Sequence, residues 1–115
     1  QTKYYDAIRW AVTTLQNQYL NNEDMEKYFN LIYEVKDVKN ANNTFLMKLT
    51  ENLISKLKHD KKLYEKLKKT CENLISHCEK INNISMKNRI EHRLAELYYL
   101  NGHYAQAMEL CNKII

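Results

Sequence analysis

Three cysteines and four histidines are the residues of this 115-residue chain best suited to bind a metal or to act as nucleophiles. Cys71 and Cys78 are seven residues apart, so a helix would place both on one face, with His77 beside Cys78. A structural zinc site needs four such ligands, and no second pair at ligand spacing completes the set. The cysteine count is odd and shows no disulfide spacing pattern. We therefore predict that Cys71, Cys78 and Cys111 are free thiols buried on apolar helix faces in a reducing compartment, with no metal and no cofactor.

Sequence motifs that carry catalysis are absent. The chain has no glycine-rich phosphate loop, no HExxH motif and no serine nucleophile flanked by glycines. Glu91 adjoins His92 and His59 adjoins Asp60, but sequence neighbours on a helix point in different directions. The sequence predicts a protein that is not an enzyme.

The densest charge lies in residues 56–69, KLKHDKKLYEKLKK, which contain seven lysines and two acidic residues. Such a run is either a solvated helix edge or a docking edge for an acidic protein surface, because opposite charge steers association. Nucleic-acid binding is a third reading, but the run has no arginine for bidentate phosphate contacts. The candidate partner-binding residues are Lys56, Lys58, Lys61, Lys62, Lys66 and Lys69.

Nine tyrosines and one tryptophan supply most of the aromatic surface. Tyrosines at core spacing are expected to pack with a solvated hydroxyl, namely Tyr4, Tyr19, Tyr64, Tyr98 and Tyr104. Tyrosines off the apolar stripes are the candidates for surface contacts, namely Tyr5, Tyr28, Tyr33 and Tyr99. Trp10 is expected in the core because of its size.

The elements that position these residues are predicted to be helices throughout. The chain has no proline and one glycine, whereas sheets and tight hairpins depend on both for their turns. Apolar periodicity predicts six helices, with short connections that make successive helices antiparallel neighbours. Their expected first residues or N-caps are Lys3, Asn22, Asn42 or Asn43, Asp60, Ser85 and His103.

The last quarter of the chain has the residue pattern of a tetratricopeptide-like pair of helices. Small residues opposite aromatic ones let two antiparallel helices approach closely, as a stacked repeat requires. We therefore predict an all-α fold, a right-handed solenoid of about three antiparallel hairpins forming one domain over residues 1–115. A closed six-helix bundle is the alternative. The expected repeat-packing residues are Leu94, Ala95, Leu97, Tyr98, Gly102, Tyr104, Ala107 and Met108.

Residues 71–115 also resemble a known family. The segment CENLISHCEKINNISMKNRIEHRLAELYYLNGHYAQAMELCNKII is similar to non-ATPase regulatory subunit 11, a lid subunit of the 26S proteasome regulatory particle. His77 and Ser85 depart from that family, which has Trp and an aromatic residue there. Upstream, the order and length of the helices agree, and LTENLISKL resembles the leucine-rich third helix. The shared residue types are Cys71, Ile75, Glu91, Arg93, Leu94, Leu97, Tyr98, Tyr104, Ala107 and Leu110.

The resemblance implies a structural role. Members of that family have an N-terminal helical solenoid and a C-terminal PCI domain, so this chain is expected to be an N-terminal fragment. They clamp the lid and the ATPase ring to the α-ring of the core particle in ubiquitin-dependent degradation, in cytoplasm and nucleus. The implied partners are other lid subunits, the regulatory ATPases and core-particle α subunits, without membrane or nucleic acid. The alternatives are a tetratricopeptide adaptor or co-chaperone and, in another class, a basic helical nucleic-acid binder.

Overall fold

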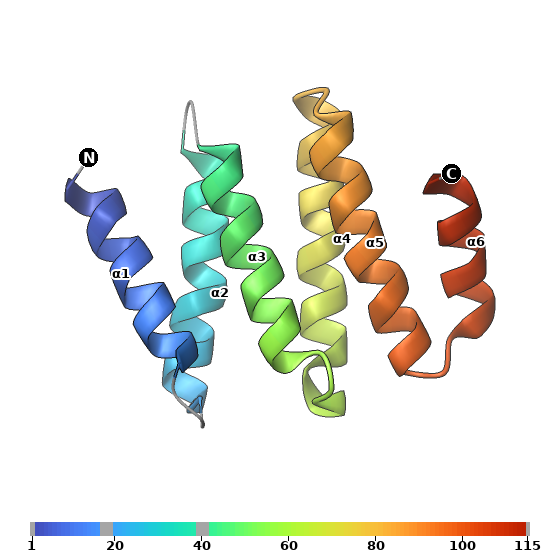
Figure 1. The fold of residues 1–115 in the computed structure, drawn as a ribbon, viewed down its shortest axis with the longest axis horizontal. Helices are drawn as coiled ribbons and strands as arrows, with labels where there is room; N and C mark the ends of the chain where they lie inside the picture. The colour runs from blue at the N-terminus through green and yellow to red at the C-terminus, as the bar shows by residue number, and fades with distance from the viewer. Residues whose placement is uncertain (1, 17–19, 39–41, 115) are drawn as a thin grey trace. The chain divides into compact units, whose positions relative to one another are not determined.

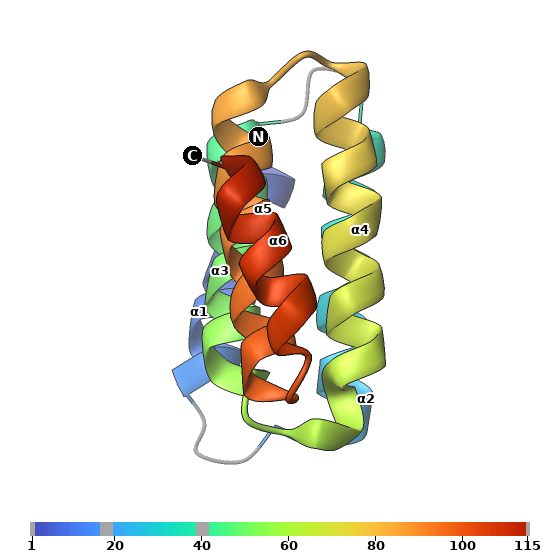
Figure 2. The same cartoon turned by 90° about the vertical axis from the view of Figure 1, so that its right-hand side faces the viewer.

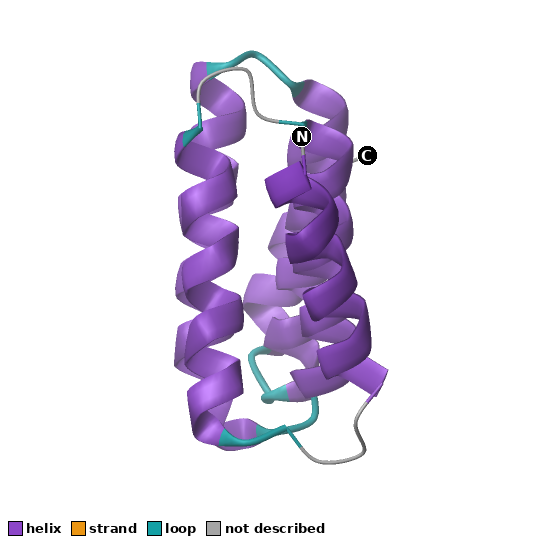
Figure 3. Cartoon of the chain, turned by 90° about the vertical axis from the view of Figure 1, so that its left-hand side faces the viewer, coloured by secondary structure: helices purple, strands orange, loops and turns teal. Residues whose placement is uncertain are grey.

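The computed structural model of the chain describes residues 2–16, 20–38 and 42–114, with the side chains of residues 2–5, 8 and 114 left aside. Helices account for nearly all of this backbone, and no strand occurs among the described residues (Figures 1 and 3). The all-α prediction is confirmed. Tyr19 and the side chains of Tyr4 and Tyr5 lie outside the described residues. The elements are α1 (Thr2–Gln16), α2 (Asn22–Asp37), α3 (Asn43–Leu57), the 3-10 helix η1 (Lys61–Leu63), α4 (Tyr64–Lys80), α5 (Ile84–Leu100) and α6 (Tyr104–Ile114).

Asparagine and aspartate side chains begin four of these elements. Asn21, Asn42, Asp60 and Asn83 each accept a hydrogen bond at 2.8–3.0 Å from a backbone N–H two or three residues further on. These bonds satisfy amides that have no partner within the helix. The predicted cap of α2 was wrong by one residue, and α5 begins at Ile84 after Asn83, not at Ser85.

The chain divides into two compact units, residues 1–53 and 54–115, and each is described by itself. In unit 1, α1 packs against α2. Tyr28 was predicted to lie on the surface, which is wrong, because its side chain is fully buried with its ring 5.7 Å from that of Trp10. The buried face of α2 contains Tyr28 in addition to Phe29, Ile32 and Val35. It is therefore wider than the apolar stripe that the spacing predicts. Buried residues of this unit include Ala11, Tyr28, Phe29, Ile32, Val35, Leu46, Leu49 and Leu53.

In unit 2, α5 lies between α4 and α6 and packs against both (Figures 1 and 2). Asn82 after α4 and Gly102 after α5 have φ angles of 57° and 82°, in the left-handed region that ends many helices. The His103 N–H donates to the Tyr98 carbonyl at 2.8 Å, which closes the turn into α6. The core residues include Leu67, Cys71, Leu74, Cys78, Ile90, Leu94 and Leu97. None of the described helices is long and apolar enough to span a membrane.

Candidate interaction sites

Large apolar side chains gather on one side of the α5–α6 pair. Tyr99, Tyr104 and Met108 are 62%, 59% and 67% exposed, respectively. The rings of Tyr99 and Tyr104 meet edge to face, with centroids 5.5 Å apart. We call Tyr99, Tyr104, Met108 and the exposed Cys111 the α5–α6 surface. They line a groove of about 570 Å³, in whose wall the buried Ala95 and Ala107 also lie.

The residues expected to pack the repeat fall into two groups. Leu94, Ala95, Leu97 and Ala107 are buried, and Tyr98 is half-buried. Gly102, Tyr104 and Met108 are exposed, and Tyr104 and Met108 differ from the prediction because they lie on the side of α6 that no described residue covers. The predicted burial of Cys111 is wrong for the same reason. The apolar spacing predicted which residues share this face of α6, namely Tyr104, Met108 and Cys111, but not that the face is exposed.

The two helices beneath this surface are fixed by close packing and by charge. Ala95 on α5 and Ala107 on α6 are small, and small residues at a helix contact shorten the distance between the axes. The Lys113 ammonium on α6 lies 3.6 Å from the carboxylate of Glu91 on α5, and the Glu91 side chain is only 4% exposed. The α5–α6 surface therefore lies on two helices that pack against each other.

The structure divides the predicted partner-binding lysines into two kinds. The Lys58 ammonium lies 3.0 Å from the carboxylate of Glu96 on α5, which Arg93 also approaches at 3.6 Å. Lys58, which directly follows α3, is thus linked to α5 by an ion pair within unit 2. Lys56 is exposed on α3. The other predicted lysines are exposed on η1 and the first half of α4, and we call them the lysine ridge: Lys61, Lys62, Lys66 and Lys69.

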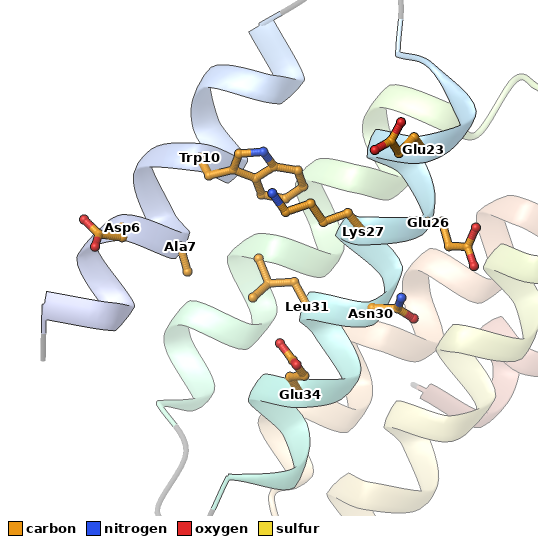
Figure 4. A pocket seen from close by; sticks show the side chains of 9 residues that line it. All are labelled: Asp6, Ala7, Trp10, Glu23, Glu26, Lys27, Asn30, Leu31 and Glu34. Carbon is orange, nitrogen blue, oxygen red and sulfur yellow. The ribbon is translucent and has the colours of Figure 1, made fainter.

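A groove of about 710 Å³ lies between α1 and α2 and was not predicted from the sequence. In Figure 4, the side chain of Lys27 on α2 extends toward the indole ring of Trp10 on α1. The Lys27 ammonium lies 4.7 Å from the indole ring, within cation–π range. Trp10, expected in the core, is half-buried in this wall. The α1–α2 groove is lined by Asp6, Ala7, Trp10, Glu23, Glu26, Lys27, Asn30, Leu31 and Glu34.

One sequence signal could have found this groove. On α2, Glu23, Glu26, Asn30 and Glu34 recur every three or four residues, which places them along one face of the helix. Trp10 lies opposite this face of α2 because of the way α1 packs. The residue spacing within α2 does not reveal that packing.

The buried thiols are held in their neutral form. Burial raises the pKa of the Cys71 thiol to about 12, and Glu72 adds to this rise. Burial also raises the pKa of Cys78. The thiolate is the form that attacks electrophiles and binds metals, so both cysteines are poor at either task near neutral pH. The described residues contain no group of three or more His, Cys, Asp or Glu side chains arranged to hold a metal ion.

Among the described residues, three surfaces are candidates for binding another macromolecule: the apolar α5–α6 surface, the lysine ridge and the α1–α2 groove. The likeness of residues 71–115 to a proteasome lid subunit stays a prediction. No protein-family model, no curated protein and no solved structure matches the chain.

Proposed function

We propose that the chain is a non-catalytic helical scaffold that binds a helix of a partner protein on the α5–α6 surface. The observation that carries this proposal is the exposure of Tyr99, Tyr104 and Met108 side by side. Contiguous exposed apolar residues on a folded domain mark interaction sites more often than they serve stability. Tyr and Met are enriched in protein interfaces, and Tyr is also enriched among the residues that contribute most of the binding energy.

The shape of the surface favours a helix as the bound element. The groove runs between two packed helices, with Ala95 and Ala107 in its wall and larger side chains around them. An amphipathic helix fills such a groove with side chains that recur every three or four residues. Fully burying one large apolar side chain contributes about 1.5–3 kcal/mol, so these three side chains would supply much of the favourable free energy of such a contact.

The narrower part of the proposal concerns the assembly. The likeness of residues 71–115 supports placing this scaffold in the lid of the 26S proteasome regulatory particle. The three helical hairpins would then stack as a right-handed solenoid and hold core-particle α subunits and regulatory ATPases. The role is positional, and it requires neither a cofactor nor a metal.

The test is affinity capture with a matched pair of variants. The tagged chain, Tyr104→Glu with Met108→Glu, and Ile84→Glu are each incubated with an extract of the source organism. Captured proteins are then quantified by mass spectrometry. Ile84 is the control, because it is 71% exposed on α5 but does not line the groove.

The proposal predicts that proteasome ATPases and core-particle α subunits are enriched by the native chain and by Ile84→Glu, and are lost with the groove variant. Equal capture by all three chains would show that the α5–α6 surface is not the binding site. Enrichment of chaperones instead would favour a tetratricopeptide adaptor. Enrichment of RNA-bound proteins that nuclease removes would favour a nucleic-acid binder. Either result would overturn the proteasome assignment.

A further inference from the structure

We infer that two copies of the chain associate head to tail, with the lysine ridge of one copy in the α1–α2 groove of the next. This interaction goes beyond the proposed scaffold function. It uses neither Tyr104 nor Met108, so the two proposals can fail independently.

The charges of the chain are divided unevenly between its two units. Residues 1–53 contain six basic and seven acidic side chains, whereas residues 54–115 contain twelve basic and seven acidic ones. The surplus of positive charge therefore belongs to unit 2, where the lysine ridge lies. Unit 1 has one more acidic than basic side chain.

The α1–α2 groove has an apolar wall and an acidic rim. Ala7, Trp10 and Leu31 supply apolar surface within it. The carboxylates of its rim are exposed and form no ion pair with a described residue; they belong to Asp6, Glu23, Glu26 and Glu34. Lys27 is the single basic residue among the side chains that line the groove.

The lysine ridge is complementary to that groove in charge and in length. Lys66 and Lys69 are three residues apart on α4 and share one face, and Lys61 and Lys62 precede them on η1. With a rise of about 2 Å per residue in η1 and about 1.5 Å in α4, the segment from Lys62 to Lys69 is about 11 Å long, and the rim from Glu26 to Glu34 spans about 12 Å. Lysine stems can pack on the Trp10 ring while their ammonium groups reach the carboxylates.

Charge complementarity favours a second copy over a nucleic acid as the occupant of the groove. A phosphate backbone would be attracted to the ridge but repelled by the acidic rim, and would leave the groove unoccupied. The ridge and the groove are different patches, so each copy keeps one of each after pairing. Such heterologous contacts build open chains or closed rings of copies, and their strength falls with salt.

Charge reversal in trans tests the inference. The ridge variant is Lys61→Glu with Lys62→Glu, and the groove variant is Glu23→Lys with Glu26→Lys. Sedimentation velocity measures the mass of the whole chain over a range of concentrations, at low and at moderate salt. The net-charge control is Lys48→Glu with Lys80→Glu, two exposed lysines outside both patches.

We expect the mass of the native chain and of the control to rise with concentration at low salt. Each patch variant alone should associate about tenfold more weakly, because like charges then face each other. A mixture of the two patch variants should associate again. The intact acidic groove of the ridge variant can bind the intact lysine ridge of the groove variant, and the two reversed patches are also opposite in charge. Asp6→Lys with Glu34→Lys replaces the groove variant if the first fails to fold by circular dichroism.

Three results would overturn the inference. They are a monomeric native chain at every concentration in low salt, no recovery in the mixture, or equal loss of association in the net-charge control. Loss of the association in Tyr104→Glu with Met108→Glu, but not in the patch variants, would assign self-association to the α5–α6 surface instead.

Discussion

The rings of Tyr99 and Tyr104 meet edge to face, 5.5 Å apart, across the turn that joins α5 to α6. Both side chains are more than half exposed, so this contact holds two large aromatic groups in place at the surface. An edge-to-face pair limits the rotamers of each ring before a partner arrives. The entropy lost on binding is then smaller than for two unrestrained side chains. The ring pair therefore pre-organises the α5–α6 surface, which we propose as the docking site.

The turn beneath this pair depends on Gly102. Its φ of 82° is strained for any residue with a Cβ, although a Cβ there would meet no atom within 4 Å. Gly102→Ala should lower the free energy of unfolding by about 1 kcal/mol through backbone strain alone. Gly102→Asn should cost less, because asparagine tolerates the left-handed region. Denaturant titration measures both, and an alanine variant as stable as the native chain would contradict this account of the turn.

Tyr28 carries a buried hydroxyl that has no hydrogen-bond partner among the described residues. Leaving a polar group unsatisfied costs about 1–3 kcal/mol, so Tyr28→Phe should raise the free energy of unfolding by about 1 kcal/mol. Burial raises the pKa of Tyr28, which means that the folded chain keeps this phenol neutral. The advantage of the phenylalanine variant should therefore grow above about pH 10, where the unfolded tyrosine ionises. A less stable variant would show that the hydroxyl is bonded after all.

Cys71 makes stability sensitive to alkaline pH. Its pKa rises from the ordinary 9.0 to about 12 on folding. Below pH 9 the thiol is neutral in both states, and its contribution to stability is fully present. Between pH 9 and 12 the unfolded chain loses a proton that the folded chain keeps, so the free energy of unfolding should fall by up to about 1.4 kcal/mol per pH unit.

Denaturant melts at several pH values test this dependence on Cys71. Cys71→Ala should be less stable at pH 7 but should show a shallower fall above pH 9. Cys111→Ala, which removes a thiol exposed in the folded chain, is the matched control. An unchanged slope in Cys71→Ala would assign the alkaline sensitivity to other groups.

Lys58 and Lys61 should respond differently to the same substitution. Lys58 pairs with Glu96 at 3.0 Å, and both side chains are about two-thirds buried. Lys58→Ala should therefore lower the free energy of unfolding by about 0.5–1 kcal/mol. Lys61→Ala, at an exposed position of η1, should stay within about 0.5 kcal/mol of the native chain. Equal losses of unfolding free energy in the two variants would show either that the stem of Lys61 packs on the core or that the Lys58–Glu96 pair does not contribute to stability.

The sequence predicted the helices well because their boundaries are marked chemically. Asn42 is one of the two residues expected to cap α3, and Asp60, expected to cap the fourth helix, caps η1 directly before α4. The N-cap of α2 was misplaced by one residue because Asn21 and Asn22 both suit the position. Apolar spacing also predicted that Leu94, Leu97 and Ala107 face the inside, and these residues are buried.

The sites were harder to predict, for a physical reason. Spacing tells which residues share a helix face, but not whether another helix covers that face, so Tyr104 and Cys111 were expected to be buried. Tyr28 was misassigned because the width of a buried stripe depends on how its neighbours pack. The α1–α2 groove joins Trp10 to residues more than ten positions away, and only packing brings them together.

The most direct test of the docking site uses Cys111 as a reporter. Its thiol is exposed in the groove, whereas Cys71 and Cys78 are buried and serve as internal references. The rate of maleimide labelling at each cysteine is measured by mass spectrometry for the free chain and for the chain bound to purified proteasome ATPases and core particle. A helix seated on the α5–α6 surface should slow labelling of Cys111 several-fold and leave the two buried thiols unreactive. An unchanged rate at Cys111 in a complex that has formed would contradict the account, because the partner would then bind elsewhere.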